Sequence, residues 1–135
     1  KMKQKFEIVN PSEIADKFDQ ISYLSLQILQ ACRYDGGITI GRDFYRPKKG
    51  YAVSTAKSFE RIFQNIEQTN IFSFILDNEA RFNEVTYIGA WQAPDGSTYL
   101  DLITVITDRE LALKLGRENN QTSIYDLGNK EEIPC

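Results

Sequence analysis

Basic and aromatic side chains are interleaved in one stretch of this 135-residue chain. Between Arg33 and Arg61, seven basic residues stand against three acidic ones, a local balance of +4 in a chain whose net charge is −3. The same stretch carries Phe44, Tyr45 and Tyr51. Guanidinium groups bind phosphate through paired hydrogen bonds and aromatic rings stack on bases, so the mixture is typical of a site for a phosphorylated, base-containing ligand. Solvated charges on a hairpin loop give the same composition, and this simpler interpretation stays open.

A second candidate anion site is Arg109, in the first turn of a predicted helix. The free N–H groups of a helix N-terminus favour an anion, and Arg109 adds a guanidinium. Asp108 and Glu110 flank it, however, and acidic residues are ordinary at a helix start. Arg117 lies eight residues further on and so on nearly the same face, where a solvated helix surface also explains it. Asn120 belongs to a three-amide segment that both ends this helix and offers groups to read a base edge or a ribose.

The sequence excludes several kinds of catalysis. It contains no histidine, which removes the Ser-His-Asp triad, the Cys-His pair and mixed Cys/His zinc sites. Neither G-x-x-x-x-G-K nor G-x-G-x-x-G occurs, so nucleotide hydrolysis by a P-loop is excluded. Four carboxylates near predicted strand ends could bind Mg²⁺ or act as acid and base: Glu84, Asp101, Asp108 and Asp126. Their spacing is also that of ordinary surface positions, so we expect no enzyme, no cofactor and no metal.

The composition is that of one soluble globular domain over residues 1–135, with 41% hydrophobic and 26% charged residues. The two cysteines, Cys32 and Cys135, are too few for a disulfide framework. No signal peptide or run of ~20 apolar residues is visible. We therefore expect a cytoplasmic protein without membrane association. A long nucleic acid is a poor partner for an acidic chain, because such binding neutralises many phosphates.

A long helix followed by a wide hairpin is predicted for the first part of the chain. Residues 10–13 have the Asn-Pro-x-Glu order of a helix start, and apolar residues then recur every three or four positions to about Arg33. Asp35-Gly36-Gly37 is expected to end this helix. Residues 38–40 and 51–54 are β-type runs on either side of the basic loop, and we expect them to pair.

The middle of the chain contains the clearest feature. Residues 84–92 and 98–106 read as two strands joined by a Pro-Asp-Gly turn. Before them, residues 55–68 return to a helical period. Residues 69–76 are predicted as a short helix capped at Thr69-Asn70, with a buried strand as the alternative.

Near the C-terminus, Thr107 and Glu110 form a predicted capping box that opens another helix. Its inward residues are expected to be Leu111, Ala112, Leu113 and Leu115. Asn119-Asn120 ends it, residues 121–127 form a last strand, and residues 128–135 form a polar tail. The sum is an α+β fold: a mainly antiparallel sheet of about five strands and two hairpins, a long N-terminal helix, and further helices on one face.

Several short motifs, in their order along the chain, resemble a pattern of small phage and prophage proteins. They are Gly36-Gly37-Ile38-Thr39, Gly50-Tyr51-Ala52-Val53-Ser54, Gly89-Ala90-Trp91, Tyr99-Leu100-Asp101-Leu102, the segment from Asp108 to Leu113, and the segment from Asn120 to Leu127. They cover nearly the whole chain after the first helix. The chain most resembles the first family of Thoeris anti-defence proteins, sponges that sequester a cyclic ADP-ribose signal.

The resemblance implies a phage protein in the host cytoplasm that captures a cyclic ADP-ribose isomer without degrading it. By this resemblance, adenine would stack on Phe82 and the diphosphate would bind Arg109. The residue type of Phe82 alone favours a position in the core or at an interface. Relatives also take up cyclic oligonucleotides, for which the basic residues Arg42, Arg46 and Lys57 would be the site. Family members form dimers or larger oligomers, so a homo-oligomer is expected.

Two other classes of protein fit the sequence. One is a protein-directed inhibitor of a bacterial defence nuclease, of the anti-CRISPR or anti-restriction type, whose acidic surface blocks a nucleic-acid channel. The other is a metal-dependent phosphodiesterase built on the carboxylates named above. Recovery of intact ligand separates the sponge from the phosphodiesterase, and a stable protein complex identifies the inhibitor.

Overall fold

A computed structural model describes residues 16–83 and 85–135 of the chain. These residues form the helices α1 (Lys17–Asp35), α2 (Gln68–Asp77) and α3 (Arg109–Glu118), the short 3₁₀ turn η2 (Lys57–Phe59), and the strands β1 (Gly37–Gly41), β2 (Tyr51–Ser54), β3 (Arg61–Phe63), β4 (Tyr87–Gln92), β5 (Thr98–Ile106), β6 (Ser123–Asp126) and β7 (Glu131–Pro134). The α+β class is therefore confirmed. The sheet is larger than predicted, with seven strands where about five were expected.

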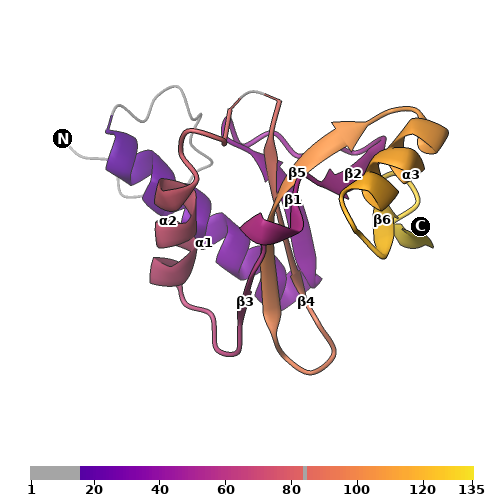
Figure 1. The fold of residues 1–135 in the computed structure, drawn as a ribbon. Helices are drawn as coiled ribbons and strands as arrows, with labels where there is room; N and C mark the ends of the chain where they lie inside the picture. Colours follow the sequence, from indigo (N-terminus) through magenta and orange to yellow (C-terminus); the bar gives the residue numbers. More distant parts are fainter. Residues whose placement is uncertain (1–15, 84) are drawn as a thin grey trace.

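All strands belong to one antiparallel sheet with the order β1-β4-β5-β2-β6-β7, and β3 pairs with β5 beside β2. The central hairpin is confirmed, since β4 pairs with β5 from Tyr87↔Ile103 to Gln92↔Thr98. The helices α1 and α2 lie together at one end of the sheet, and α3 lies at the other (Figure 1).

The helix α1 begins and ends at residues that suit these positions. The carboxylate of Asp16 accepts a hydrogen bond of 2.7 Å from the Phe18 N–H, which caps the first turn. The cap predicted within residues 10–13 lies outside the described residues. The predicted C-terminus is confirmed, because Gly36 ends the helix with a φ of +86°, a conformation that side chains with a Cβ disfavour.

The first predicted hairpin is wrong, although both of its strands exist. Strand β1 pairs with β4 at the edge of the sheet, whereas β2 pairs with β5 and β6. Periodicity identifies a strand but not its partner, and the loop between β1 and β2 is long enough for the chain to cross to another part of the sheet.

The helix predicted for residues 55–68 is also wrong. The chain leaves β2, forms η2, and returns to the same edge of β5 as strand β3. Both the backbone N–H and the hydroxyl of Thr55 donate to the Leu102 carbonyl, at 2.9 and 3.2 Å. Phe59, Phe63 and Ile66 pack against the core from this irregular segment, so their helix-like spacing reflects burial without a helix.

The predicted starts of two helices and the predicted C-terminal tail need smaller corrections. Helix α2 is confirmed, but Glu67 caps it and Asn70 is the reciprocal partner in the capping box. Helix α3 is capped by Asp108, and Leu111 is 53% exposed, while Ala112 is buried. The predicted polar tail contains β7, and its Ile133 is buried in one cluster with Ala112 of α3.

The sheet has one face packed by the helices. Ile88, Leu100 and Leu102 contact α1 and α2 in the main core, and Val53 and Ile124 lie in a second cluster with α3. Register and alternation along the strands put all five side chains on the same face. The opposite face has its own small cluster at the β2 end, formed by Ala52, Ile103 and Leu127. No helix among residues 16–83 and 85–135 has the length and hydropathy needed to cross a bilayer.

Candidate functional site

A cavity of about 270 Å³ opens between the end of α1, the loop from β3 to α2, and the tip of the β4–β5 hairpin. These three segments converge at the lower end of the view in Figure 1. The lining residues are Cys32, Arg33, Gln64, Asn65, Ile66, Glu67, Gln92, Gly96 and Thr98. The lining is mostly polar and combines one guanidinium, one carboxylate and three side-chain amides, a set that recognises hydrogen-bonding groups of a small ligand.

Strand register and one backbone hydrogen bond fix the hairpin wall of the cavity and the end of α1 beside it. Gln92 and Thr98 are register partners on the helix-packed face, because they alternate with Ala90 and Leu100 of the core. The Gln92 N–H donates to the Gly36 carbonyl at 2.9 Å, which holds the end of α1 beside the hairpin. The cavity is therefore built where two ends of regular elements meet.

Arg33 is the cationic group of this cavity. It is exposed in the last turn of α1, and it forms no ion pair or hydrogen bond through its side chain with any residue that the structure describes. The carboxylate of Glu67, by contrast, already accepts from the Asn70 N–H, and the Glu67 N–H donates to the Asn70 side chain at 2.9 Å. Arg33 is thus available to an anionic group of a ligand, while Glu67 is engaged in holding the first turn of α2.

Cys32 is the cysteine among the residues that line the cavity, and its thiol is poorly reactive. The residue is 2% exposed, and burial raises the pKa of its thiol to about 11. A thiol with such a pKa is almost entirely protonated near neutral pH, and the thiolate is the reactive form. Cys32 is therefore a poor nucleophile near neutral pH.

Arg42 and Phe82, two predicted ligand residues, do lie together, but around a void of only about 10 Å³. Arg42 forms an ion pair of 3.6 Å with Glu79, which also pairs with Lys17. Both cations lower the pKa of the Glu79 carboxyl, Lys17 the more strongly. Phe82 is 2% exposed in the main core, so its ring has no free face on which adenine could stack.

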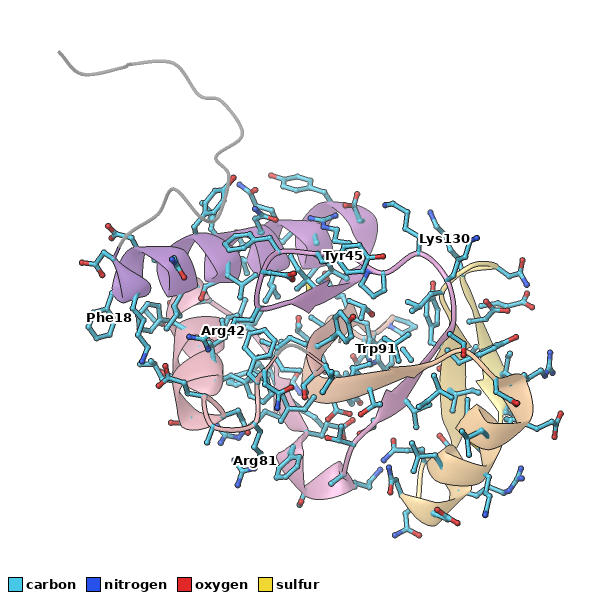
Figure 2. All side chains as sticks on the ribbon, turned by 90° about the horizontal axis from the view of Figure 1, so that it is seen from above. Phe18, Arg42, Tyr45, Arg81, Trp91 and Lys130 are labelled. Atoms are coloured by element: carbon cyan, nitrogen blue, oxygen red, sulfur yellow. The ribbon has the colours of Figure 1, made fainter. Side chains whose placement is uncertain are left out.

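The predicted residues of α3 lie elsewhere. Arg109 is exposed at the start of the helix, near Asp126, whose pKa it helps to lower after the hydrogen bonds from Asn129 and Gly128. Arg117 is exposed, and so is Asn120, which has a φ of +59° and follows Asn119, the C-cap of α3. Figure 2 shows Arg42 at the α1–α2 end of the molecule, far from α3. The structure therefore does not bring Arg42 and Arg109 to one site.

Arg46 and Lys57 complete the predicted set. Arg46 is exposed in the loop between β1 and β2. Lys57, in η2, is exposed and acts electrostatically on Asp101 of β5. The basic segment is thus distributed over several surfaces, as the interpretation of solvated loop charges expects.

The carboxylates considered for a phosphodiesterase are also apart. Asp101 lies on the sheet face away from the helices, Asp108 caps α3, and Asp126 accepts the N–H groups of Gly128 and Asn129 at 3.0 and 3.1 Å. Glu84 lies outside the described residues. Within the described ranges, no three Asp, Glu, Cys or His side chains are grouped as metal ligands.

No protein-family profile, curated protein or solved structure matches this chain. The candidate site consequently rests on geometry. The sequence places Arg33 in the basic segment, but Gln64, Asn65 and Gln92 were not among the predicted site residues. The first two fell in a segment predicted as helix, and amides carry no periodic signal that would have marked them as neighbours of Gln92.

Proposed function

We propose that the protein binds a small phosphorylated nucleotide in the 270 Å³ cavity and releases it unchanged, as a sponge for a cyclic nucleotide signal. The observation that carries the proposal is the guanidinium of Arg33, which has no side-chain partner among residues 16–83 and 85–135, at a cavity whose lining also includes three side-chain amides. The ligand class, a cyclic ADP-ribose isomer or a cyclic oligonucleotide, comes from the resemblance of the sequence motifs to the Thoeris anti-defence sponges.

The size of the cavity limits how the ligand sits. Ligand pockets commonly measure about 300–1,000 Å³, so a cavity of about 270 Å³ accommodates a base with its ribose and leaves other groups at the rim. The amides of Gln64, Asn65 and Gln92 offer both donors and acceptors, as a base edge requires. Arg33 would pair with a phosphate oxygen, for which its fork of N–H donors is suited.

An oligomer would complete this arrangement. Because the cavity opens to solvent, part of a cyclic nucleotide would remain outside it, and a second subunit of the expected homo-oligomer would cover that part. Arg109 and three basic residues of the β1–β2 loop, Arg46, Lys48 and Lys49, are exposed and would be available at such a subunit boundary. This assembly is part of the proposal and is tested by measuring the molecular mass with and without ligand.

The direct experiment incubates the purified protein with a panel of cyclic ADP-ribose isomers and cyclic di- and trinucleotides. The filtrate and the material released by heat are then analysed by mass spectrometry. We expect one compound to be depleted from the filtrate and recovered intact after heating. Altered products would show an enzyme, and failure to deplete any compound would contradict the proposal.

Two matched variants assign the binding to the cavity. Arg33→Ala removes the proposed phosphate partner, whereas Arg117→Ala removes an exposed arginine from α3. Depletion should be lost or strongly reduced in Arg33→Ala and kept in Arg117→Ala. The opposite pattern would move the site to α3, where the resemblance places the diphosphate on Arg109.

A further inference from the structure

The solvent-facing side of α1 differs in charge from that of α3. None of residues 20–32 is charged, although this stretch of α1 includes the exposed Leu26. On α3, five of the six exposed positions are charged: Arg109, Glu110, Lys114, Arg117 and Glu118. The depletion of charge over several turns of an exposed helix side is typical of the centre of a protein interface.

Leu26 marks the centre of this side, and the nearest charges along the helix lie at equal distances from it. Asp19 is seven residues before Leu26, and Arg33 is seven residues after it. Seven residues are almost two full turns, so both charged residues lie within about 20° of the direction of Leu26 around the helix. Lys17 and Asp35 are nine residues away, which puts them on the opposite side of the helix axis. We call the side from Asp19 to Arg33 the Leu26 face.

Neighbouring elements flank the Leu26 face and leave its centre open. On one flank, the side chain of Gln68 in α2 donates to the Ser22 carbonyl at 2.9 Å. On the other flank, the ring of Tyr23 contacts that of Phe44 in the β1–β2 loop, with centroids 5.4 Å apart. Leu26 points between these two flanks and is 37% exposed. In Figure 2, α1 runs along the border of the molecule.

The two charges on the Leu26 face have no counterpart within the chain. Among residues 16–83 and 85–135, neither the carboxylate of Asp19 nor the guanidinium of Arg33 forms an ion pair. On the α2 flank, Asp77 pairs with Arg61, and Glu67 is held in the capping box. The β1–β2 loop on the other flank is basic, with these charged residues: Arg42, which pairs with Glu79, Asp43, Arg46, Lys48 and Lys49.

We propose that α1 is the contact between two copies of this chain, which pack antiparallel about a two-fold axis at Leu26. The axis places Leu26 of one copy against Leu26 of the other, and Asp19 of each copy beside Arg33 of the other. Charge complementarity selects this occupant and this direction, because a parallel pair would place like charges together. Antiparallel helices also bring the opposite partial charges of their ends together.

The expected association is weak. One helix face from each copy forms a small interface, below about 1,200 Å² of total buried surface, and the two basic loops beside Tyr23 repel each other. We therefore expect a dissociation constant in the micromolar range. The inference does not depend on a bound nucleotide. Arg33 also lines the cavity, so the second copy comes close to its opening, and the several N–H donors of the guanidinium leave some for a phosphate when Asp19 is paired.

Sedimentation equilibrium of the full chain at several protein concentrations, without ligand, tests this proposal. We expect a monomer–dimer equilibrium that weakens as the salt concentration rises, because exposed ion pairs are screened. Leu26→Glu puts two carboxylates together at the two-fold axis and should weaken the dimer about a hundredfold. Leu111→Glu makes the same change at an exposed leucine of α3 and should leave the equilibrium unchanged.

Exchange of the two charges gives a second test, which damage to the helix cannot imitate. Asp19→Arg and Arg33→Asp each turn both ion pairs into like-charge pairs and should weaken the dimer about five- to fiftyfold. The double variant has opposite charges again and should dimerise like wild type. Both substitutions are unfavourable for the helix dipole, so a loss caused by damage to α1 would be larger in the double variant. Far-ultraviolet circular dichroism checks that each variant is folded.

Each of three results would overturn the proposal. The first is a protein that stays monomeric up to millimolar concentration. The second is a dimer that Leu26→Glu and Leu111→Glu affect equally, which would place the contact on another surface. The third is a double charge variant that dimerises no better than the two single variants, which would remove the pairing of Asp19 with Arg33.

Discussion

The backbone N–H of Gln92 donates to the carbonyl of Gly36 at 2.9 Å and fastens the end of α1 to the end of β4. Gly36 has a φ of +86°, and this conformation turns the chain from the helix into β1. The same junction sets Arg33 and Gln92 on the walls of one cavity. The proposed site thus depends on a helix terminus that was visible in the sequence and on a contact that was not.

Gly36→Ala is expected to destabilise the fold by about 1–2 kcal/mol, the cost of the left-handed conformation for a residue with a Cβ. Steric overlap does not contribute to this loss of stability, because no heavy atom lies within 4 Å of the added Cβ. The measurement is the free energy of unfolding from urea denaturation. Gln30→Ala, at an exposed position in the same helix, is the control and should leave that free energy nearly unchanged. Equal values for both variants would mean that Gly36 does not need its special conformation.

Gly89→Ala is expected to destabilise the protein by about 1–3 kcal/mol for a different reason, overpacking. A Cβ at position 89 would lie 2.6 Å from Cγ1 of Ile103, on the neighbouring strand. Since Ile103→Ala removes the clashing atoms, Gly89→Ala should cost much less in that background. Additive free energies in this double-mutant cycle would argue against the contact.

Asp101→Asn is expected to change the pH dependence of stability. Burial raises the pKa of this carboxyl from 3.8 to about 6, against the smaller lowering effects of Ser54 and the Leu102 N–H. The folded state therefore holds the proton more tightly than the unfolded state, and ionisation of Asp101 reduces stability as the pH rises from about 4 to about 6. Above that range the cost of burying the charge is fully present. Asp101→Asn should lose this decline and gain up to about 3 kcal/mol relative to wild type at pH 7–8.

The measurement is urea denaturation of both proteins at several pH values between 4 and 8. The two curves should diverge as the pH rises and then run parallel. Curves that are parallel over the whole range would show that Asp101 titrates normally.

Ser54→Ala is expected to change the free energy of unfolding little. The Ser54 hydroxyl is buried without a well-formed hydrogen bond, although it lies close enough to Asp101 to lower the pKa of that carboxyl. The same urea denaturation measures this variant.

Alkylation of the cysteines provides a test of the cavity wall. At pH 8, iodoacetamide should modify Cys135, which is partly exposed, well before Cys32, which is buried with a raised pKa. A ligand in the cavity should slow the modification of Cys32 further and leave Cys135 unaffected, as followed by mass spectrometry of the peptides. Equal rates at the two cysteines would contradict the burial of Cys32.

Local signals in the sequence predicted local structure well. Residues close together in the chain determine the end of α1 at Gly36, the β4–β5 hairpin and the end of α3 at Asn119. Pairing between distant segments was not predictable in this way. The Thr55 bonds to Leu102 and the placement of β1 beside β4 depend on tertiary contacts that override the helical period of residues 55–68 and the expected pairing of β1 with β2.

The same limit applies to the candidate site. A basic residue such as Arg33 stands out in the composition, but Gln64 and Gln92 become its neighbours only when the hairpin tip, the β3–α2 loop and α1 meet. Residue type favours a core or interface position for Phe82 and the motif resemblance assigns it to a ligand; its burial at 2% exposure agrees with the first of these.

The central claim is tested most directly by isothermal titration of the released nucleotide, or of cyclic ADP-ribose isomers, into wild type, Arg33→Ala and Arg117→Ala. A charge-assisted hydrogen bond contributes about 1.5–3 kcal/mol, so Arg33→Ala should weaken binding by about 10- to 100-fold. Arg117→Ala should bind like wild type. Unchanged affinity in Arg33→Ala, with the fold intact, would contradict the assignment of the cavity as the nucleotide site.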